Sequence, residues 1–89
     1  MFHRPIEVRT QGSVIILQNA QFKKQDMAII GQYALKARTG CSDTLPSGAK
    51  ISANAQGTII LTGANGILVM TTPEALFLAY SEVDNLVTL

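Results

Sequence analysis

Three pairs of short apolar runs, each joined at a glycine, constrain the fold of this 89-residue chain most strongly. Glycine supplies the positive backbone angles that tight turns between antiparallel strands require. Residues 6–10 alternate between uncharged and charged side chains, as a half-buried strand does. The sequence therefore predicts hairpins over residues 6–17, 27–38 and 57–71, and Asn65 followed by Gly66 makes the third the clearest.

The second pair has an alternative interpretation as one helix at about residues 21–38. At 100° per residue, its apolar side chains fall on one broad arc and most polar ones on the opposite side. However, Gly31 in the middle of such a helix costs about 1 kcal/mol relative to alanine, and Lys23 and Asp26 interrupt the apolar arc. Two strands are therefore preferred, and the helix stays as the alternative.

A C-terminal helix is predicted over residues 73–83. Thr71 and Glu74 have the spacing of a capping box, and Pro73 suits the first turn of a helix. The side chains expected to pack on the sheet are those of Leu76, Phe77 and Tyr80.

Together these elements predict a single domain over residues 1–89 that is mainly β. The expected architecture is a small antiparallel barrel or rolled sheet built from hairpins, with one C-terminal helix; the alternative is an α+β fold with a helix at about 21–38. Residues 39–49, rich in glycine, serine and proline, are expected to form a loop, and residues 86–89 an apolar edge strand. The expected core consists of Val14, Ile16, Ile30, Leu35, Ile59, Leu61, Leu68, Met70, Phe77 and Tyr80.

Charge is unevenly distributed along the chain. Residues 1–50 hold all seven Lys and Arg residues and three acidic ones, a net charge of +4, whereas residues 51–89 hold three acidic residues and no basic one, a net charge of −3. If folding keeps these segments apart, a basic side would bind an anion and an acidic side would bind a protein. The anion-binding candidates are Arg4, Arg9, Lys23, Lys24, Lys36 and Arg38, and the protein-interaction candidates are Glu74, Glu82, Asp84, Leu86 and Val87.

The composition is apolar for so short a chain, with 47% hydrophobic and 15% charged residues. A small domain cannot bury all of its apolar surface, so part of that surface should face a partner. We therefore expect a homo-oligomer or a complex with another protein.

No motif in the chain specifies a reaction. A zinc site needs four ligands, or three and a water, and His3 and Cys41 have no carboxylate cluster beside them. The sequence therefore predicts no enzyme, no catalytic residue, no metal site and no cofactor. The single cysteine favours a cytoplasmic setting, and we expect neither a signal peptide nor a membrane-spanning helix.

Both ends of the chain resemble small phage-associated proteins that carry a Pro-Gly-Asp-Tyr-Gly signature. The similar segments are residues 3–9, with a basic residue, a proline and a short strand, and residues 57–83, with two strands about a glycine turn. The signature itself is absent, since Ala55, Gln56, Gly57 and Thr58 stand in its place. The resemblance implies a phage or mobile-element accessory protein and transfers no functional residue.

These observations favour a small non-enzymatic binding protein that acts by occupying a protein partner. The alternative is a binder of a nucleotide, RNA or single-stranded DNA that uses the basic N-terminal half.

Overall fold

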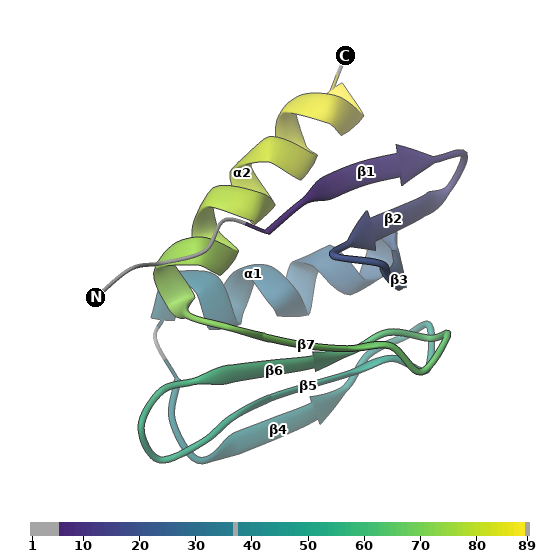
Figure 1. Cartoon of the computed structure of the whole chain (residues 1–89). Coiled ribbons are helices and arrows are strands. Elements are labelled where there is room, and N and C mark those ends of the chain that lie inside the picture. The colour runs from purple at the N-terminus through teal and green to yellow at the C-terminus, as the bar shows by residue number, and fades with distance from the viewer. Residues whose placement is uncertain (1–5, 37, 89) are drawn as a thin grey trace.

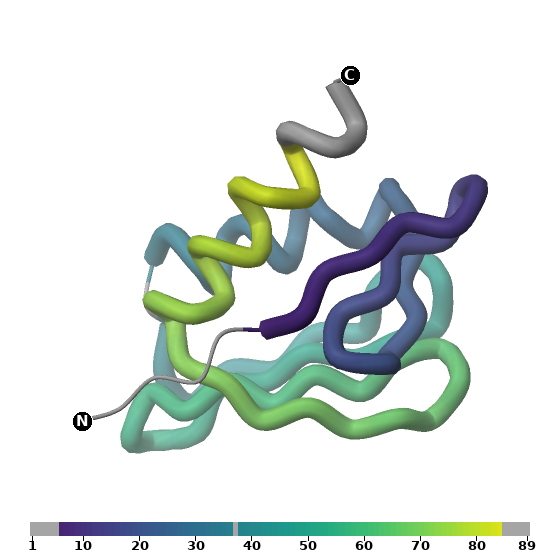
Figure 2. Tube along the Cα trace, turned by 45° about the horizontal axis from the view of Figure 1, so that its top comes forward, coloured from purple at the N-terminus to yellow at the C-terminus, as the bar shows by residue number. Residues whose placement is uncertain are grey.

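The computed structural model describes residues 6–36 and 38–88, and the side chains among them as far as Asp84. Its elements are β1 (Val8–Gln11), β2 (Val14–Leu17), β3 (Ala20–Lys23), η1 (Lys24–Asp26), α1 (Met27–Lys36), β4 (Cys41–Thr44), β5 (Lys50–Ala53), β6 (Ile59–Thr62), β7 (Leu68–Thr71) and α2 (Pro73–Thr88). Strands β1 to β3 form one antiparallel sheet and β4 to β7 another, each in sequence order. Both helices and the three-stranded sheet lie on the same side of the four-stranded sheet (Figure 1 and Figure 2).

The predicted barrel is wrong, because the fold is α+β with two separate open sheets. The first and third hairpins form where the sequence predicted them, as β1–β2 and β6–β7. The second predicted hairpin is instead largely the helix α1. Because residues 27–36 form a helix, they add no strands that could join the three-stranded and four-stranded sheets into one closed sheet.

Two distant contacts explain why residues 27–36 are helical. The Asp26 carboxylate is fully buried and accepts hydrogen bonds from the N–H groups of Lys23 at 2.9 Å and Ser47 at 3.0 Å, which fixes the start of the helix. Gly31 lies against Tyr80 of α2, and a Cβ atom at Gly31 would lie only 2.8 Å from the tyrosine ring. The alternative interpretation is right for this segment, but residues 20–23 form β3 and not helix.

The expected loop over residues 39–49 contains a strand. Strand β4 pairs with β5, with Asp43 opposite Ile51, and the turn between them closes through a 2.8 Å hydrogen bond from Leu45 N–H to Ala49 C=O. The sequence of β4 has little β propensity. Its strand forms because β5 provides a pairing partner and because Tyr33 holds Asp43 from the inner side.

Helix α2 extends further than predicted, to Thr88. The edge strand predicted over residues 86–89 is therefore wrong for residues 86–88, which are helical, and residue 89 lies outside the described part of the chain. Leu86 and Val87 fall within the helix, and their side chains lie outside the described part of the chain. Within residues 6–36 and 38–88, no helix has the length and apolar character needed to cross a membrane.

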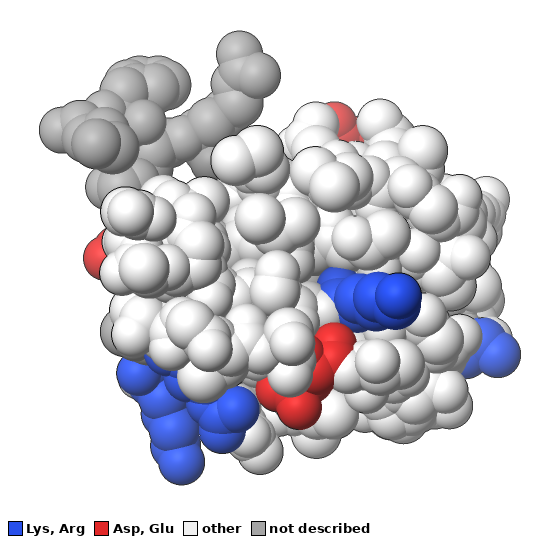
Figure 3. All heavy atoms as spheres, turned by 90° about the horizontal axis from the view of Figure 1, so that it is seen from below, with Lys and Arg blue, Asp and Glu red and all other residues white. Residues whose placement is uncertain are grey.

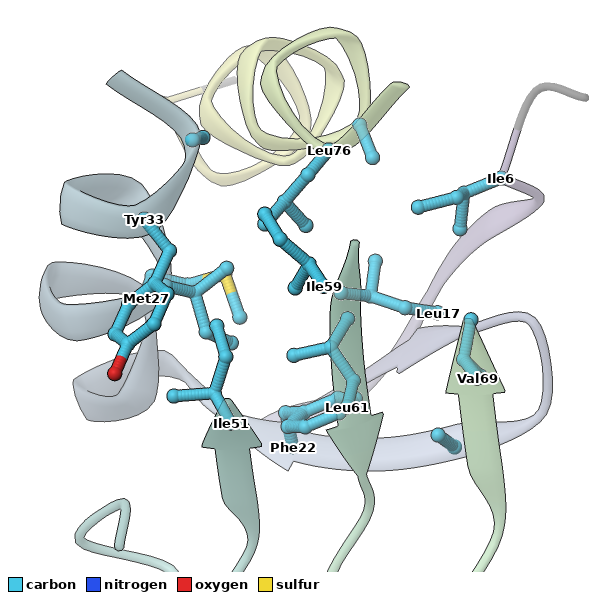
Figure 4. Packing of buried hydrophobic residues seen from close by; sticks show 14 of the residues in the cluster. Ile6, Leu17, Phe22, Met27, Tyr33, Ile51, Ile59, Leu61, Val69 and Leu76 are labelled. Carbon is cyan, nitrogen blue, oxygen red and sulfur yellow. The ribbon is translucent and has the colours of Figure 1, made fainter. Parts of the chain in front are cut away.

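The core lies between the helices, the three-stranded sheet and the inner face of the four-stranded sheet. Figure 4 shows Leu76 of α2 reaching toward Ile59 of β6, while the Tyr33 ring of α1 lies beside Met27 and near Ile51 of β5. The largest fully buried side chains are those of Tyr33, Phe22, Leu17, Ile30, Ile51, Ile59, Leu61, Leu76 and Asp26.

Several residues of the expected core lie outside it. In β7, Val69 and Thr71 face inward, so the alternating positions Leu68 and Met70 face solvent. In α2, the buried face runs through Ala75, Leu76, Ala79 and Val83, which leaves Phe77 at the surface. The expected core residues that are exposed are Leu35, Leu68, Met70 and Phe77, and those only half-buried are Val14 and Tyr80.

The turn between β6 and β7 joins the two sheets. Ala64 N–H donates to Gln21 C=O at 2.8 Å, and Gln21 N–H donates to the Asn65 side chain at 3.2 Å. Asn65 also donates to Asn19 C=O at 3.0 Å. The contact is so close that a Cβ atom at Gly63 would lie 2.5 Å from the Gln21 nitrogen. The outer edge of β3 is therefore occupied by this turn.

Candidate functional site

Helices α1 and α2 pack closely and run in opposite directions. Met27, at the start of α1, lies with Val83, in the second half of α2, around one small cavity. Ala34, near the end of α1, lies with Pro73, the first residue of α2, around another hollow. Gly31 lets the helices approach midway between these points. The pair therefore presents a ridge of two helices to solvent, with a groove at the end where α2 begins.

That groove is lined by large apolar side chains from both helices. The side chains of Leu35, Phe77 and Leu78 are 65%, 42% and 66% exposed. They surround a hollow of about 510 Å³ together with Ala34, Pro73 and Glu74. Exposed leucines grouped in this way, unlike single ones, are typical of an interaction surface.

Glu74 lies at this groove, and it does not have the capping role that the sequence suggested. Thr72 caps α2, since its side-chain oxygen accepts a hydrogen bond from Ala75 N–H at 3.2 Å, and Thr71 is a buried residue of β7. Glu74 is exposed in the first turn, where a carboxylate interacts favourably with the helix dipole. It thus adds a negative charge to the rim of an otherwise apolar groove.

The other acidic candidates lie further along α2. Glu82 is exposed, and Asp84 lines a cavity of about 130 Å³ together with Lys24. That cavity brings together the basic N-terminal segment and the acidic C-terminal one. The fold therefore does not keep the two oppositely charged segments apart.

The basic candidates do not share one face. Lys23 and Lys24 precede α1, whereas Lys36 and Arg38 lie at its other end, roughly 15 Å away for ten residues of helix. Arg9 lies on β1, where it forms an ion pair with Glu7 at 3.5 Å and donates to Asn19 at 3.2 Å. The sixth candidate, Arg4, lies outside the described residues.

Arg38 is part of a cluster that ties α1 to β4. The Tyr33 hydroxyl donates to Asp43 at 2.7 Å, and the Arg38 guanidinium lies 3.6 Å from the same carboxylate and 5.2 Å from the centre of the Tyr33 ring. Burial, together with the hydrogen bond to Asp43, raises the pKa of Tyr33 from 10.0 to about 12. These contacts stabilise the β4 edge of the sheet. They also pair the Arg38 guanidinium with groups of its own chain.

Cys41 is exposed at the start of β4, where its thiol donates to Thr39 C=O at 3.3 Å. His3, the base that a thiol nucleophile would need, lies outside the described residues. Among the residues that the structure describes, no three His, Cys, Asp or Glu side chains gather as metal ligands would. Every buried side-chain oxygen and nitrogen there has a hydrogen-bond partner.

The outer face of the four-stranded sheet is a second surface, which sequence reasoning missed. Figure 3 looks onto this side of the molecule from below and shows that most of it is uncharged. Eight side chains of the four strands face outward there, and Lys50 is the charged one among them. The row Thr44, Lys50, Thr62 and Leu68 lies next to the row Ser42, Ser52, Ile60 and Met70.

A sequence signal for the helix groove did exist. Residues 75–80 contain more apolar side chains than one face of a helix can bury, so some of them had to face solvent. The apolar pattern predicted Phe77 and Leu35 in the core and indicated no role for Leu78. Of the groove residues, only Glu74 was identified as an interaction candidate.

Comparison with known proteins finds no matching family model, no similar curated protein and no similar solved structure. The resemblance to phage-associated proteins therefore stays a prediction.

Proposed function

We propose that this chain is a small non-enzymatic interaction module that binds a protein partner through the groove between α1 and α2. The observation that supports the proposal is the grouping of Leu35, Phe77 and Leu78, from two helices, around one hollow. The other large apolar side chains that the structure describes on the two helices are buried or half-buried, so these three are not explained by packing among the described residues. The resemblance and the single Cys41 add the prediction of an accessory protein that acts in the cytoplasm.

The chemistry of α2 indicates which kind of partner fits. The helix carries Glu74, Glu82 and Asp84 and contains no Lys, Arg or His. A partner helix with an apolar face flanked by Lys or Arg would bury leucine side chains in the groove and place a positive charge beside Glu74, the carboxylate at its rim. We therefore take the occupant to be a basic amphipathic helix.

The experiment uses a synthetic helical peptide of about four turns with leucines at i, i+3, i+4 and i+7 and lysines on both flanks. Its binding to the full chain is measured by fluorescence anisotropy against a matched peptide whose lysines are replaced by glutamates. The test variant is Leu78→Ser, and the control variant is Leu68→Ser, which changes a similarly exposed leucine on β7.

The lysine peptide should bind at least about tenfold more tightly than the glutamate peptide, and Leu78→Ser should weaken binding by about tenfold or more. Leu68→Ser should leave the affinity unchanged. Equal binding of both peptides, or equal loss in both variants, would contradict the proposal.

The alternative function is the binding of a small anion, and one observation favours it. Lys50 lies among the hydroxyl groups of Ser42, Thr44, Ser52 and Thr62 over a hollow of about 370 Å³ on the outer sheet face. Titration with inorganic phosphate should then shift the amide NMR signals of β5, and the shift should weaken as the salt concentration rises. Lys50→Gln should abolish this effect. If Arg9→Gln and Lys36→Gln have the same effect as Lys50→Gln, the anion is bound non-specifically.

A further inference from the structure

The two open sheets have four outer edges, and residues that the structure describes protect three of them. Edge strands usually carry a charge, a cover or an inward-pointing ionisable residue that prevents pairing with other molecules. Strand β1 carries Arg9 and packs along α2. The edge of β3 is occupied by the Gly63–Gly66 turn through two hydrogen bonds at Gln21, and β4 holds Asp43 turned inward to Tyr33.

Strand β7 has none of these protections within the part of the chain that the structure describes. It contains no charged residue and no proline, and the whole of residues 51–73 is uncharged. No described strand pairs with it on the side opposite β6. Its outward side chains, Leu68 and Met70, are 59% and 66% exposed.

The hydrogen-bond pattern shows which main-chain groups face this edge. Gly63 N–H donates to Ile67 C=O at 2.8 Å, so these two residues form a hydrogen-bonded pair. In an antiparallel ladder such pairs alternate with pairs that exchange no hydrogen bonds. Val69 and Thr71 therefore bond to β6, whereas the N–H and C=O groups of Leu68 and Met70 point away from it, toward the edge.

We infer that β7 pairs with β7 of a second copy of this chain, antiparallel about a two-fold axis, and joins two four-stranded sheets into one of eight strands. Identical strands are self-complementary in this arrangement, because Leu68 of each copy lies opposite Met70 of the other. That register uses all four outward main-chain groups of each β7. It also places Val69 opposite Val69 on the axis.

A second copy is a better occupant of this edge than a charged partner segment. Neither copy brings a charge to the contact, and the net charge of +1 per chain gives little repulsion. Each Leu68 gains an apolar cross-strand neighbour in Met70, a pairing that stabilises sheets. Two strands of four residues bury well under the ~800 Å² per partner of a stable dimer, so the association should be weak and should depend on concentration.

The first experiment is sedimentation velocity of the full chain from about one micromolar to about half a millimolar. The wild-type chain should shift from monomer to dimer across this range. Met70→Pro removes an outward N–H that β6 does not use, and a proline at such an edge position is tolerated. It should keep the chain folded by circular dichroism and monomeric throughout. The control Leu78→Ser, in the helix groove, should still dimerise.

The second experiment tests the register by disulfide formation in a Cys41→Ser background. Leu68→Cys and Met70→Cys chains are oxidised separately and as a mixture. The mixture should form crosslinked dimers because the two positions face each other, at about 5.5 Å between Cα atoms. Each chain alone should crosslink little.

A wild-type chain that stays monomeric at every concentration would overturn the inference. So would a dimer that survives Met70→Pro and is lost in Leu78→Ser, since the helix groove would then be the contact. Crosslinking that is equal in the mixture and in either single chain would reject the proposed register.

Discussion

The two edge strands of the four-stranded sheet, β4 and β7, differ in how the rest of the chain contacts them. Strand β4 has weak β propensity, yet Tyr33 and Arg38 hold Asp43, and the turn that follows is tied to the buried Asp26 through Ser47. Strand β7 has strong β propensity, but no described residue beyond β6 pairs with it, and its outward side chains are apolar. The β4 edge is completed by contacts within the chain, whereas the β7 edge stays open among the described residues and is the edge at which we propose dimerisation.

We therefore expect the stability of the monomer and its association to depend on different parts of this small domain. Substitutions around β4 should destabilise the monomer and leave association intact. Substitutions on β7 should do the reverse.

Asp26→Ala should cause the largest loss of monomer stability. It leaves the N–H groups of Lys23 and Ser47 and the Ser47 hydroxyl without their buried acceptor, which should lower the free energy of unfolding by about 2–4 kcal/mol. Urea unfolding measures the loss. The control Glu82→Ala changes an exposed carboxylate and should cost less than about 0.5 kcal/mol. Similar losses in the two variants would mean that Asp26 does not tie the β4–β5 turn to the start of α1.

Ionisation of the Tyr33 hydroxyl should destabilise the folded chain at alkaline pH. Its pKa is raised from 10.0 to about 12 by burial and by the hydrogen bond to Asp43, so the unfolded chain releases this proton before the folded chain does. The stabilisation that the protonated hydroxyl gives to the folded chain is fully present below pH 10 and is lost as the pH rises through about 12. The free energy of unfolding should fall by about 2–3 kcal/mol over this range.

The measurement is urea unfolding from pH 9 to pH 12, with Tyr33→Phe as the comparison. The difference in the free energy of unfolding between the wild-type chain and Tyr33→Phe should shrink steadily above about pH 10. A constant difference across that range would show that the hydroxyl is not held in the folded chain as described.

Met70→Ser should change the stability of the monomer least. Because the Met70 side chain is 66% exposed, the free energy of unfolding at micromolar concentration should change by less than about 0.5 kcal/mol. The same variant should weaken dimerisation several-fold, as measured by sedimentation. A large loss of monomer stability would mean that the outer face of β7 is covered within the chain.

The sequence predicted those elements whose determinants are local. The β1–β2 and β6–β7 hairpins depend on turn residues and branched runs next to each other, and the start of α2 depends on Pro73. Helix α1 depends instead on Tyr80 packing at Gly31 and on Ser47 bonding to Asp26, partners 49 and 21 positions away. Local propensity contains no information about such contacts, so Gly31 was taken for a turn.

The candidate surfaces were missed for a related reason. A continuous apolar run such as Ile67–Met70 gives no alternation, so it does not show which side of the strand is buried. Helix α2 offered two apolar arcs, and the one with the smaller side chains, including Ala75 and Ala79, faces the core because it allows close packing. The larger Phe77 was therefore assigned to the core, where its replacement by alanine would be costly. At 42% exposure, that replacement should cost little.

Amide hydrogen exchange, measured by NMR at low and high protein concentration, tests the open edge of β7 most directly. At low concentration the amides of Val69 and Thr71 should be protected, and those of Leu68 and Met70 should exchange rapidly. At high concentration Leu68 and Met70 should slow by about tenfold or more, while the outward amides of Ser42 and Thr44 on β4 stay fast. Exchange at Leu68 and Met70 that is independent of concentration would contradict the account.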